Sequence, residues 1–241
     1  MQIYSKTDKG KVRSTNQDAF FAGRISETEV IAIICDGMGG AKAGNIASET
    51  AVKVILDYVT NSYRIGMDEN QIEKMLKNAI ESANIDVYDM AQKSPDYYGM
   101  GTTAVVAFCK GDKVIIAHAG DSRAYLIGDT ITQITRDHSI VQSLLEQGEI
   151  TEEDAKLHPE KNIITRAIGA EENILSDSDI IDVSAGETVL LCTDGLNNYV
   201  DKDTIFATVK STACENLPDE LIRLANKNGG GDNITVIALT K

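Results

Sequence analysis

Several features that the sequence lacks narrow the class of protein. No segment approaches the roughly 18 consecutive apolar residues of a membrane-spanning helix. The first residues, MQIYSKTDKGKVR, contain no apolar stretch typical of a secretion signal. The four cysteines show no CxxC or metal-finger spacing, and three of them, Cys35, Cys109 and Cys192, lie in apolar strand-like runs. We therefore expect a soluble, cytoplasmic protein with reduced thiols and no disulfides.

Positive charge is also scarce. The 23 Lys and Arg residues face 37 Asp and Glu residues, which gives a formal net charge of -14. A surface of this sign repels nucleic-acid phosphates and anionic lipids, so we expect neither nucleic acid nor a membrane as a partner. The acidity serves solubility alone, or part of it forms a carboxylate cluster that binds cations. At 241 residues and 42% apolar content, the chain can bury a core without a stapling disulfide or metal.

Repeats, low-complexity segments and a Pro-rich linker are absent, which indicates one domain over residues 1–241. Runs rich in Val and Ile predict strands at Glu29–Cys35, Thr102–Cys109, Lys113–Ala119, Arg123–Ile127, Thr188–Cys192 and Ile234–Leu239. Apolar periodicity predicts four helices: about Ala43–Tyr58, a second with its apolar face from Ile72 to Val87, and a later pair at about Asp203–Lys210 and Pro218–Asn226.

The order of these elements indicates the fold class. Short connections, such as the turn at Gly111 and Asp112, favour antiparallel pairing, and paired helices do not follow the βαβ rhythm of a parallel sheet. We predict an α+β fold of two stacked antiparallel β-sheets (a β-sandwich) flanked by pairs of antiparallel helices, in αββα layers. Residues 137–165 fit no such pattern. A short helical stretch, SIVQSLLEQGEI, precedes polar TEEDAKLHPEKN, so we predict an irregular surface insertion.

Four aspartates share one setting, at the end of an apolar strand or just beyond it, with small or turn residues following. They are Asp36 in IAIICDGMGG, Asp121 in IIAHAGDSRAY, Asp194 in VLLCTDGLNN and Asp232 in NGGGDNITVI. A single Asp-Gly pair is most often only a turn. Carboxylates gathered from distant segments around Mg²⁺ or Mn²⁺ would instead form a two-metal hydrolytic site. The residues alone leave both interpretations open.

Other chemistries lack their sequence signatures. The three histidines, His118, His138 and His158, show neither HxxxH nor HExxH spacing, which argues against zinc. The chain contains no P-loop for nucleotides and no GxSxG elbow for a serine nucleophile.

At these residues the sequence resembles the type 2C family of metal-dependent protein serine/threonine phosphatases, specifically its bacterial branch. The similarity covers nearly the whole chain through ordered motifs: GKVRSTNQD, CDGMGG, GTTAVVA, AGDSRAY, DHS, HPEKNIITRAIG, LCTDGL and GGGDNITVI. The resemblance implies a β-sandwich flanked by helix pairs, a Mn²⁺ or Mg²⁺ centre, and hydrolysis of phosphoserine and phosphothreonine in proteins.

The resemblance also implies a set of metal ligands. Asp36 corresponds to the carboxylate that bridges two core ions, and the Gly37 carbonyl to a ligand of one of them. Asp194 and Asp232 correspond to ligands of the other ion. Asp121, together with Asp194, corresponds to a third, weaker metal site.

Further roles follow from the same resemblance. Asp18, which closes RSTNQD, is similar to the acidic residue that holds metal-bound water. Arg13 resembles the arginine that grips the substrate phosphate, a task suited to a planar fork of donors. Asn233 is expected to orient Asp232 or a water. Residues 137–165 correspond to a mobile flap near the active site.

In the family's mechanism, a water or hydroxide bridging the metals attacks phosphorus in line with the leaving serine oxygen, without a covalent phosphoenzyme. Expected partners are phosphorylated proteins and a cognate bacterial serine/threonine kinase, and the chain is expected to be a monomer. One alternative is a non-catalytic relative that acts as a binding module, although no metal carboxylate is lost. Another is a dedicated phosphatase of a small regulatory protein, such as an anti-sigma antagonist, although such enzymes usually carry sensor or membrane segments.

Ala41 is where the sequence departs from many relatives. They continue the glycine-rich segment with a histidine, DGMGGH, which is credited with protonating the leaving alkoxide. Here metal-bound water, or a histidine from elsewhere such as His138 or His158, has to supply that proton.

We predict that Ala41→His speeds hydrolysis of a phosphoserine peptide by less than tenfold, against roughly 10²–10⁴-fold for a well-placed general acid, because metal-bound water already donates the proton. p-Nitrophenyl phosphate is the control, since its leaving group hardly needs an acid and its rate should change little. If a flap histidine is the donor, Ala41→His is neutral and substitution of that histidine slows the peptide reaction. Equal effects on both substrates would contradict the leaving-group argument.

Overall fold

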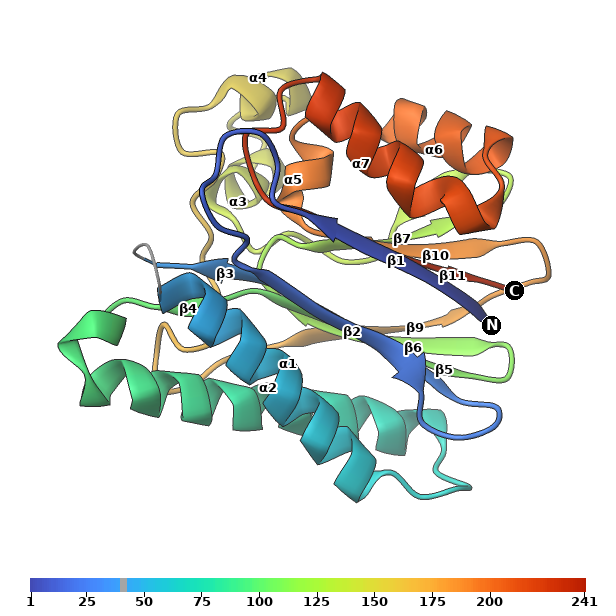
Figure 1. Cartoon of the computed structure of the whole chain (residues 1–241), viewed down its shortest axis with the longest axis horizontal. Coiled ribbons are helices and arrows are strands. Elements are labelled where there is room, and N and C mark those ends of the chain that lie inside the picture. Colours follow the sequence, from blue (N-terminus) through green and yellow to red (C-terminus); the bar gives the residue numbers. More distant parts are fainter. Residues whose placement is uncertain (40–42) are drawn as a thin grey trace.

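The fold has four layers: a helix pair, two antiparallel sheets and a second helix pair (Figure 1). It is seen in a computed structural model that describes residues 1–39 and 43–241. The predicted αββα arrangement is confirmed. Among the residues described, no helix combines the length and the apolar content needed to cross a bilayer.

All strand pairs are antiparallel. The five-stranded sheet has the order β1 (Gln2–Asp8), β11 (Ile234–Thr240), β10 (Thr188–Cys192), β7 (Arg123–Ile127) and β8 (Ile131–Gln133). The six-stranded sheet has the order β2 (Asp18–Arg24), β3 (Val30–Met38), β5 (Ala104–Lys110), β6 (Lys113–Ala119) and β9 (Asp177–Asp182), and the short β4 (Gly101–Thr102) pairs with the end of β3.

The side chains of the molecule pack into three hydrophobic cores, and alternation along β3 supplies two of them. Ile31, Ile33 and Cys35 face α1 (Ala43–Ser62) and α2 (Glu69–Lys93), whereas Val30, Ala32 and Ile34 face the other sheet. The five-stranded sheet packs its outer face against α5 (Asp194–Asn197), α6 (Lys202–Ser211) and α7 (Leu217–Lys227). Because successive side chains point to opposite faces, a strand buried on both sides reads as a continuous apolar run.

Four strands, β1, β2, β8 and β9, were not predicted from the sequence. Each is the edge strand of its sheet in the strand order, so one side of its backbone and much of its surface face solvent. Edge strands can carry polar and charged residues, as in DSDIID of β9. They therefore lack the apolar runs that identified the buried strands. The predicted helices are all present, and α2 continues to Lys93 beyond its apolar stripe.

The insertion at residues 137–165 is more ordered than predicted. Its first half contains α3 (Ile140–Glu146), as expected, but the polar second half also forms a helix, α4 (Glu152–Leu157). A capping box between Thr151 and Asp154 satisfies backbone donors at the start of α4, which explains a helix in so polar a segment. Short 3₁₀ turns, η1 (Pro95–Tyr97) and η2 (Cys214–Asn216), complete the connections.

Candidate metal centre

Five acidic side chains converge around Asp36, and two of them, Asp121 and Asp194, line a cavity together with residues of the flap helices α3 and α4. Asp36 lies in the last part of β3 and Asp18 begins β2, where the two residues are paired in the ladder. Asp121 follows β6, and Asp194 follows β10 as the first residue of α5. Asp232 precedes its strand, β11, so its predicted place after a strand was wrong.

Asp36 is at the centre of this cluster. The charges of the four other aspartates, Asp18, Asp194, Asp121 and Asp232, all act on its carboxyl group. The carboxyl group of Asp194 lies within hydrogen-bonding reach of it. The Asp36 backbone is held from both sides by Thr103, whose hydroxyl accepts from its N–H at 2.9 Å and whose N–H donates to its carbonyl at 2.9 Å. The position of the side chain therefore rests on a fixed backbone.

Two hydroxyl groups position Asp18. Thr193 and Thr235 donate to its Oδ2 at 3.0 and 2.6 Å. Its Oδ1 is buried and has no hydrogen-bond partner in the structure described. The motif analysis missed both threonines, although each stands beside a predicted ligand segment, in LCTDGL and GGGDNITVI.

Gly37 sits where no side chain fits. A Cβ atom at this position would lie 2.1 Å from the Gly44 carbonyl oxygen and 2.5 Å from that of Gln17. The Gly37 N–H donates to the Gln17 carbonyl at 3.1 Å. The close approach of β3, the β1–β2 loop and the first turn of α1 therefore requires glycine here.

Arg13 and Asn233 organise the β1–β2 loop. Arg13 Nη2 contacts Asp232 Oδ2 at 2.7 Å, with half of its side chain exposed (52%). Asn233 donates to the Lys9 and Thr15 carbonyls at 2.9 Å each, and its Oδ1 accepts from the Gln17 N–H at 2.8 Å. Its side chain thus fastens the loop, while its backbone N–H donates to Asp232 Oδ1 at 2.9 Å.

The electrostatics of the cluster are unfavourable without cations. Burial, reinforced by the neighbouring carboxylates, raises the pKa of Asp18 and of Asp121 to about 7 and that of Asp194 to about 6. The same two causes raise the pKa of Asp36 well above its ordinary value.

The available donor atoms fit hard divalent cations. Asp194 Oδ1, like Asp18 Oδ1, is buried without a hydrogen-bond partner in the part of the chain described. Buried carboxylate oxygens are rarely left unsatisfied, and the ligand set consists of oxygen atoms alone, which suits Mg²⁺ or Mn²⁺.

A cavity of about 590 Å³ adjoins the cluster between the flap and α5. Asp121 and Asp194 both line it, together with residues of α3, α4 and the segment after α5. At its base, Arg123 forms a fork with the buried Asp137, with contacts of 2.6 to 3.0 Å. The flap therefore lies over a hollow that opens beside the aspartates.

His138 is one of the candidates for the proton donor that Ala41 replaces. Ala41 lies outside the described residues. Both ring nitrogens of His138 are engaged, Nδ1 with the Gly120 N–H at 3.1 Å and Nε2 with Asp177 at 3.2 Å. His138 is therefore not free to donate at the cluster in this structure.

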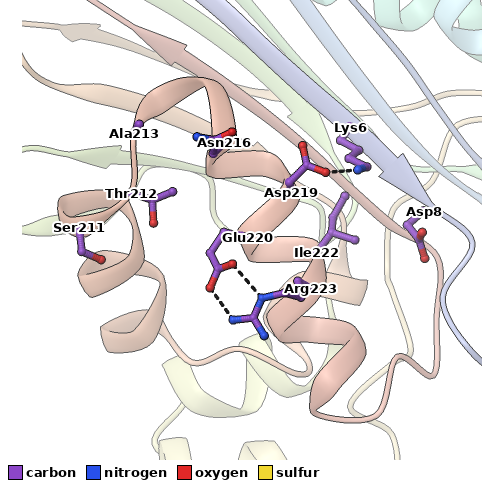
Figure 2. A pocket seen from close by; sticks show the side chains of 10 residues that line it. All are labelled: Lys6, Asp8, Ser211, Thr212, Ala213, Asn216, Asp219, Glu220, Ile222 and Arg223. Carbon is purple, nitrogen blue, oxygen red and sulfur yellow. Dashed lines mark hydrogen bonds and ion pairs between the residues drawn. The ribbon is translucent and has the colours of Figure 1, made fainter.

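A second hollow, of about 640 Å³, lies away from this cluster, between β1 and the segment that joins α6 to α7 (Figure 2). Its charged side chains pair with one another: Lys6 with Asp219, and Arg223 with Glu220. Asp8 accepts from Asn226 and from the Gly10 N–H. With these charges matched internally, the hollow does not resemble a site for a charged ligand.

Comparison with known proteins identifies the family. The family model described as Protein phosphatase 2C matches residues 8–224. A Listeria innocua protein named serine/threonine phosphatase stp is 38% identical over 243 residues, covering 100% of this chain and 96% of its own. The crystal structure of Stp1 from Staphylococcus aureus superposes with a TM-score of 0.93 at 36% identity, covering 100% of this chain and 94% of the other.

A second solved structure bears on the metal. The catalytic domain of the phosphatase PstP, in complex with 2 manganese ions, matches with a TM-score of 0.84 at 31% identity and covers 98% of this chain and 96% of its own.

We predict that Asp36→Asn leaves the metal-free protein as stable as the parent or slightly more stable. The folded-state pKa of Asp36 lies above the unfolded value, so the ionised group destabilises the fold at every pH above that unfolded value. A relief of about 1 kcal/mol would raise the Tm by about 2–4 °C in thermal melts at pH 7 with chelator. Asp57→Asn, on the exposed face of α1, is the matched control. A clear loss of stability specific to Asp36→Asn would contradict the repulsive cluster.

Proposed function

Because this chain belongs to the protein phosphatase 2C family and is a metal-dependent protein serine/threonine phosphatase, we propose that the aspartate cluster is its catalytic centre. In this proposal two core ions, Mn²⁺ or Mg²⁺, are held by Asp36, the Gly37 carbonyl, Asp194 and Asp232. Asp121, with Asp194, contributes to a third and weaker site. The observation that carries the assignment is that two buried carboxylate oxygens, Asp18 Oδ1 and Asp194 Oδ1, have no hydrogen-bond partner among residues 1–39 and 43–241.

When bound, the cations would activate water as a nucleophile and neutralise charge on the phosphoryl oxygens. The chain's own groups position the reactants. Asp18, held by two threonine hydroxyls, presents its free oxygen to a water. Half of the Arg13 side chain is exposed, so its guanidinium could exchange Asp232 for the substrate phosphate, to which it offers two parallel donors. The backbone contacts of Thr103 keep Asp36 in place during this exchange.

Substrates are phosphorylated proteins, and we propose that the cavity beneath the flap receives residues that flank the phosphorylated side chain. The cavity opens beside Asp121 and Asp194, and its lining combines basic side chains such as Lys156 with acidic ones such as Glu152. Its mixed polar lining and position favour a segment of extended polypeptide over a small apolar ligand.

The state of the cysteines bears on the cellular setting that we propose. Three cysteines are buried and unpaired, and the fourth, Cys214, is free as well, which fits a reducing compartment such as the bacterial cytoplasm. There the enzyme would reverse a cognate serine/threonine kinase. Residues 1–241 would act as one catalytic domain, and the net charge of -14 favours a monomer through self-repulsion.

We predict that turnover of a phosphothreonine peptide requires added Mn²⁺ or Mg²⁺ and stops in EDTA. Serine- and cysteine-modifying reagents should have no effect, because the proposed ligands are oxygen atoms and Cys35, Cys109 and Cys192 are buried. Phosphate release with each metal, and with chelator, is the measurement. Asp36→Asn, which removes the charge shared by both ions, should be inactive under all conditions. Full turnover in chelator would exclude the metal mechanism.

We predict that Arg13→Ala raises KM for a phosphopeptide on the order of tenfold or more and lowers kcat less, because a charge-assisted pair to the ground-state phosphate is lost. Arg13→Lys is the matched control, which keeps the charge but not the fork, and should fall between parent and Arg13→Ala. Steady-state kinetics of the three proteins distinguish binding from chemistry. Unchanged phosphopeptide kinetics in Arg13→Ala would show that Arg13 is only a solvated loop cation.

A further inference from the structure

His138 is a buried histidine at the entrance to the flap. It lies directly before α3 and is 2% exposed. Its ring stacks on that of His118, at the end of β6, with centroids 4.8 Å apart and planes at 9°. Asp177, the first residue of β9, and Arg166, just after the flap, complete the group.

The hydrogen bonds of this group decide between two chemistries. His118, His138 and Asp177 have potential ligand atoms within 4.8 Å of one another, close enough for a metal ion. The Gly120 N–H, however, donates to His138 Nδ1 at 3.1 Å, which places the proton of the neutral ring on Nε2, and Nε2 donates to Asp177 Oδ2 at 3.2 Å. Arg166 Nη1 lies 3.1 Å from the same nitrogen, but with Nε2 protonated the guanidinium directs its hydrogen bond to Asp177 Oδ1 at 2.8 Å. Arg166 contacts Asp177 at 2.8 Å and already supplies the positive charge there. The group is therefore a hydrogen-bond assembly.

His138 binds Gly120 through two hydrogen bonds. Besides the ring contact, the His138 backbone N–H donates to the Gly120 carbonyl oxygen at 3.0 Å. Gly120 is the residue before Asp121, in the turn that leaves β6. This pair of bonds, one from the backbone and one to the side chain of the same residue, is called the Gly120 clasp below.

The turn that carries Asp121 has little freedom on its other side. Gly120 has φ +111°, and a Cβ there would lie 2.6 Å from Thr103 Cβ. Thr103 in turn shares a 2.8 Å hydrogen bond with Ser122, the residue after Asp121, and holds the Asp36 backbone. The clasp therefore holds the Gly120–Asp121 turn in contact with Thr103, the residue that fixes the Asp36 backbone.

His138 also holds the flap. Its carbonyl oxygen accepts from the Thr165 N–H at 2.8 Å, and this hydrogen bond joins the two ends of the flap segment. The neighbouring Ser139 and Ile164 form a bridge, and Ile140 donates to the Ile163 carbonyl at 3.0 Å. One buried residue therefore contacts both the base of the flap and the turn that bears Asp121.

We propose that His138 is a positioning residue: its Gly120 clasp fastens the base of the flap to the Asp121 turn and so sets the flap and the Asp121 carboxylate in one geometry. The link to metal binding rests on the proposed role of Asp121. The geometric part, that Nδ1 of His138 orders the Gly120–Asp121 backbone, is independent of any metal.

Two substitutions separate the two edges of the ring. His138→Asn keeps an acceptor, the amide oxygen, close to the position of Nδ1, but loses the contact with Asp177. His138→Gln reaches toward Asp177 but offers no acceptor to the Gly120 N–H. Both variants lose the stacking on His118, so each controls for the other in packing.

Amide hydrogen exchange on the metal-free protein is the primary test. In His138→Gln the amides of Gly120, Asp121 and Thr165 should exchange about tenfold faster than in the parent, since a buried donor loses its partner. In His138→Asn they should stay near the parent rate. If the two variants behave alike, both protected or both fast, the ring acts only by packing and the proposal is overturned.

A second test uses the parent and His138→Asn alone, in case His138→Gln does not fold. Burial lowers the pKa of His138, with further lowering by His118 and Arg166, against the raising effect of Asp177. The neutral ring therefore prevails at pH 7, and protonation of Nδ1 in acid would remove the acceptor. Protection of Gly120, corrected for intrinsic exchange, should fall in the parent as the pH is lowered past the ordinary histidine range, and not in His138→Asn. Burial and like charge raise the pKa of the nearby Asp121 carboxyl, so the test lies in the difference between parent and His138→Asn and not in the pH response of either protein alone. The same pH response in both would overturn the proposal.

Calorimetric Mn²⁺ titration tests the connection to the metal site. His138→Gln should weaken, by several-fold, the same weak binding step that Asp121→Ala removes, and His138→Asn should not. If Asp121→Ala leaves the titration unchanged, the third-site assignment fails, while the exchange experiments still decide whether the clasp exists. A weak step that is lost in Asp121→Ala but equally strong in both His138 variants would overturn the link between clasp and metal.

Discussion

Mutual repulsion among five carboxylates is the constraint on which the site depends. Burial and like charge raise the pKa values of Asp18, Asp36, Asp121 and Asp194, so the cluster is held together by the framework and not by its own contacts. That framework consists of backbone hydrogen bonds to Asp36, hydroxyl donors to Asp18 and a glycine without room for a side chain. Burial of apolar side chains in the two helix–sheet cores and in the core between the sheets supplies the free energy that offsets this electrostatic cost. Cation binding would recover that cost, which couples metal affinity to the rigidity of the strand ends.

The sequence predicted the part of the fold that is buried on both sides. Runs such as VIAII in β3 are apolar because each face meets a core, and such runs are visible without any structural knowledge. The edge strands β1, β2, β8 and β9 were not predicted, because a strand that faces solvent on one side does not need a continuous run of apolar residues. Helix α4 escaped for a similar reason, since its capping box and not its apolar pattern supports it. Local signals therefore identified the interior of the sandwich and not its borders.

The site divides in the same way. Asp36 lies near the end of an apolar strand, and Asp121 and Asp194 lie just beyond one, so their convergence could be expected from the strand ends alone. Asp18 and Arg13, in contrast, were identified only through the family resemblance. The hydroxyl donors Thr193 and Thr235, and the pairing of His138 with Gly120, have no sequence signature. They join segments up to 217 residues apart, and such contacts follow from the register of the sheets, which composition and periodicity do not determine.

The pairing of β1 with β11 has a consequence for the order in which the protein can be built. Gln2 pairs with Thr240, so among the described residues the in-sheet neighbour of β1 is β11, more than 200 residues further along the sequence. During synthesis β1 has to wait, unpaired, until β11 has left the ribosome. Asp232 and Asn233 directly precede β11, so the loop bearing Arg13 gains its fastening, and the cluster its fifth carboxylate, in that same late step. A nascent chain that has not yet released β11 therefore lacks Asp232 and the Asn233 contacts that fasten the Arg13 loop, so these parts of the centre form with the closure of the five-stranded sheet.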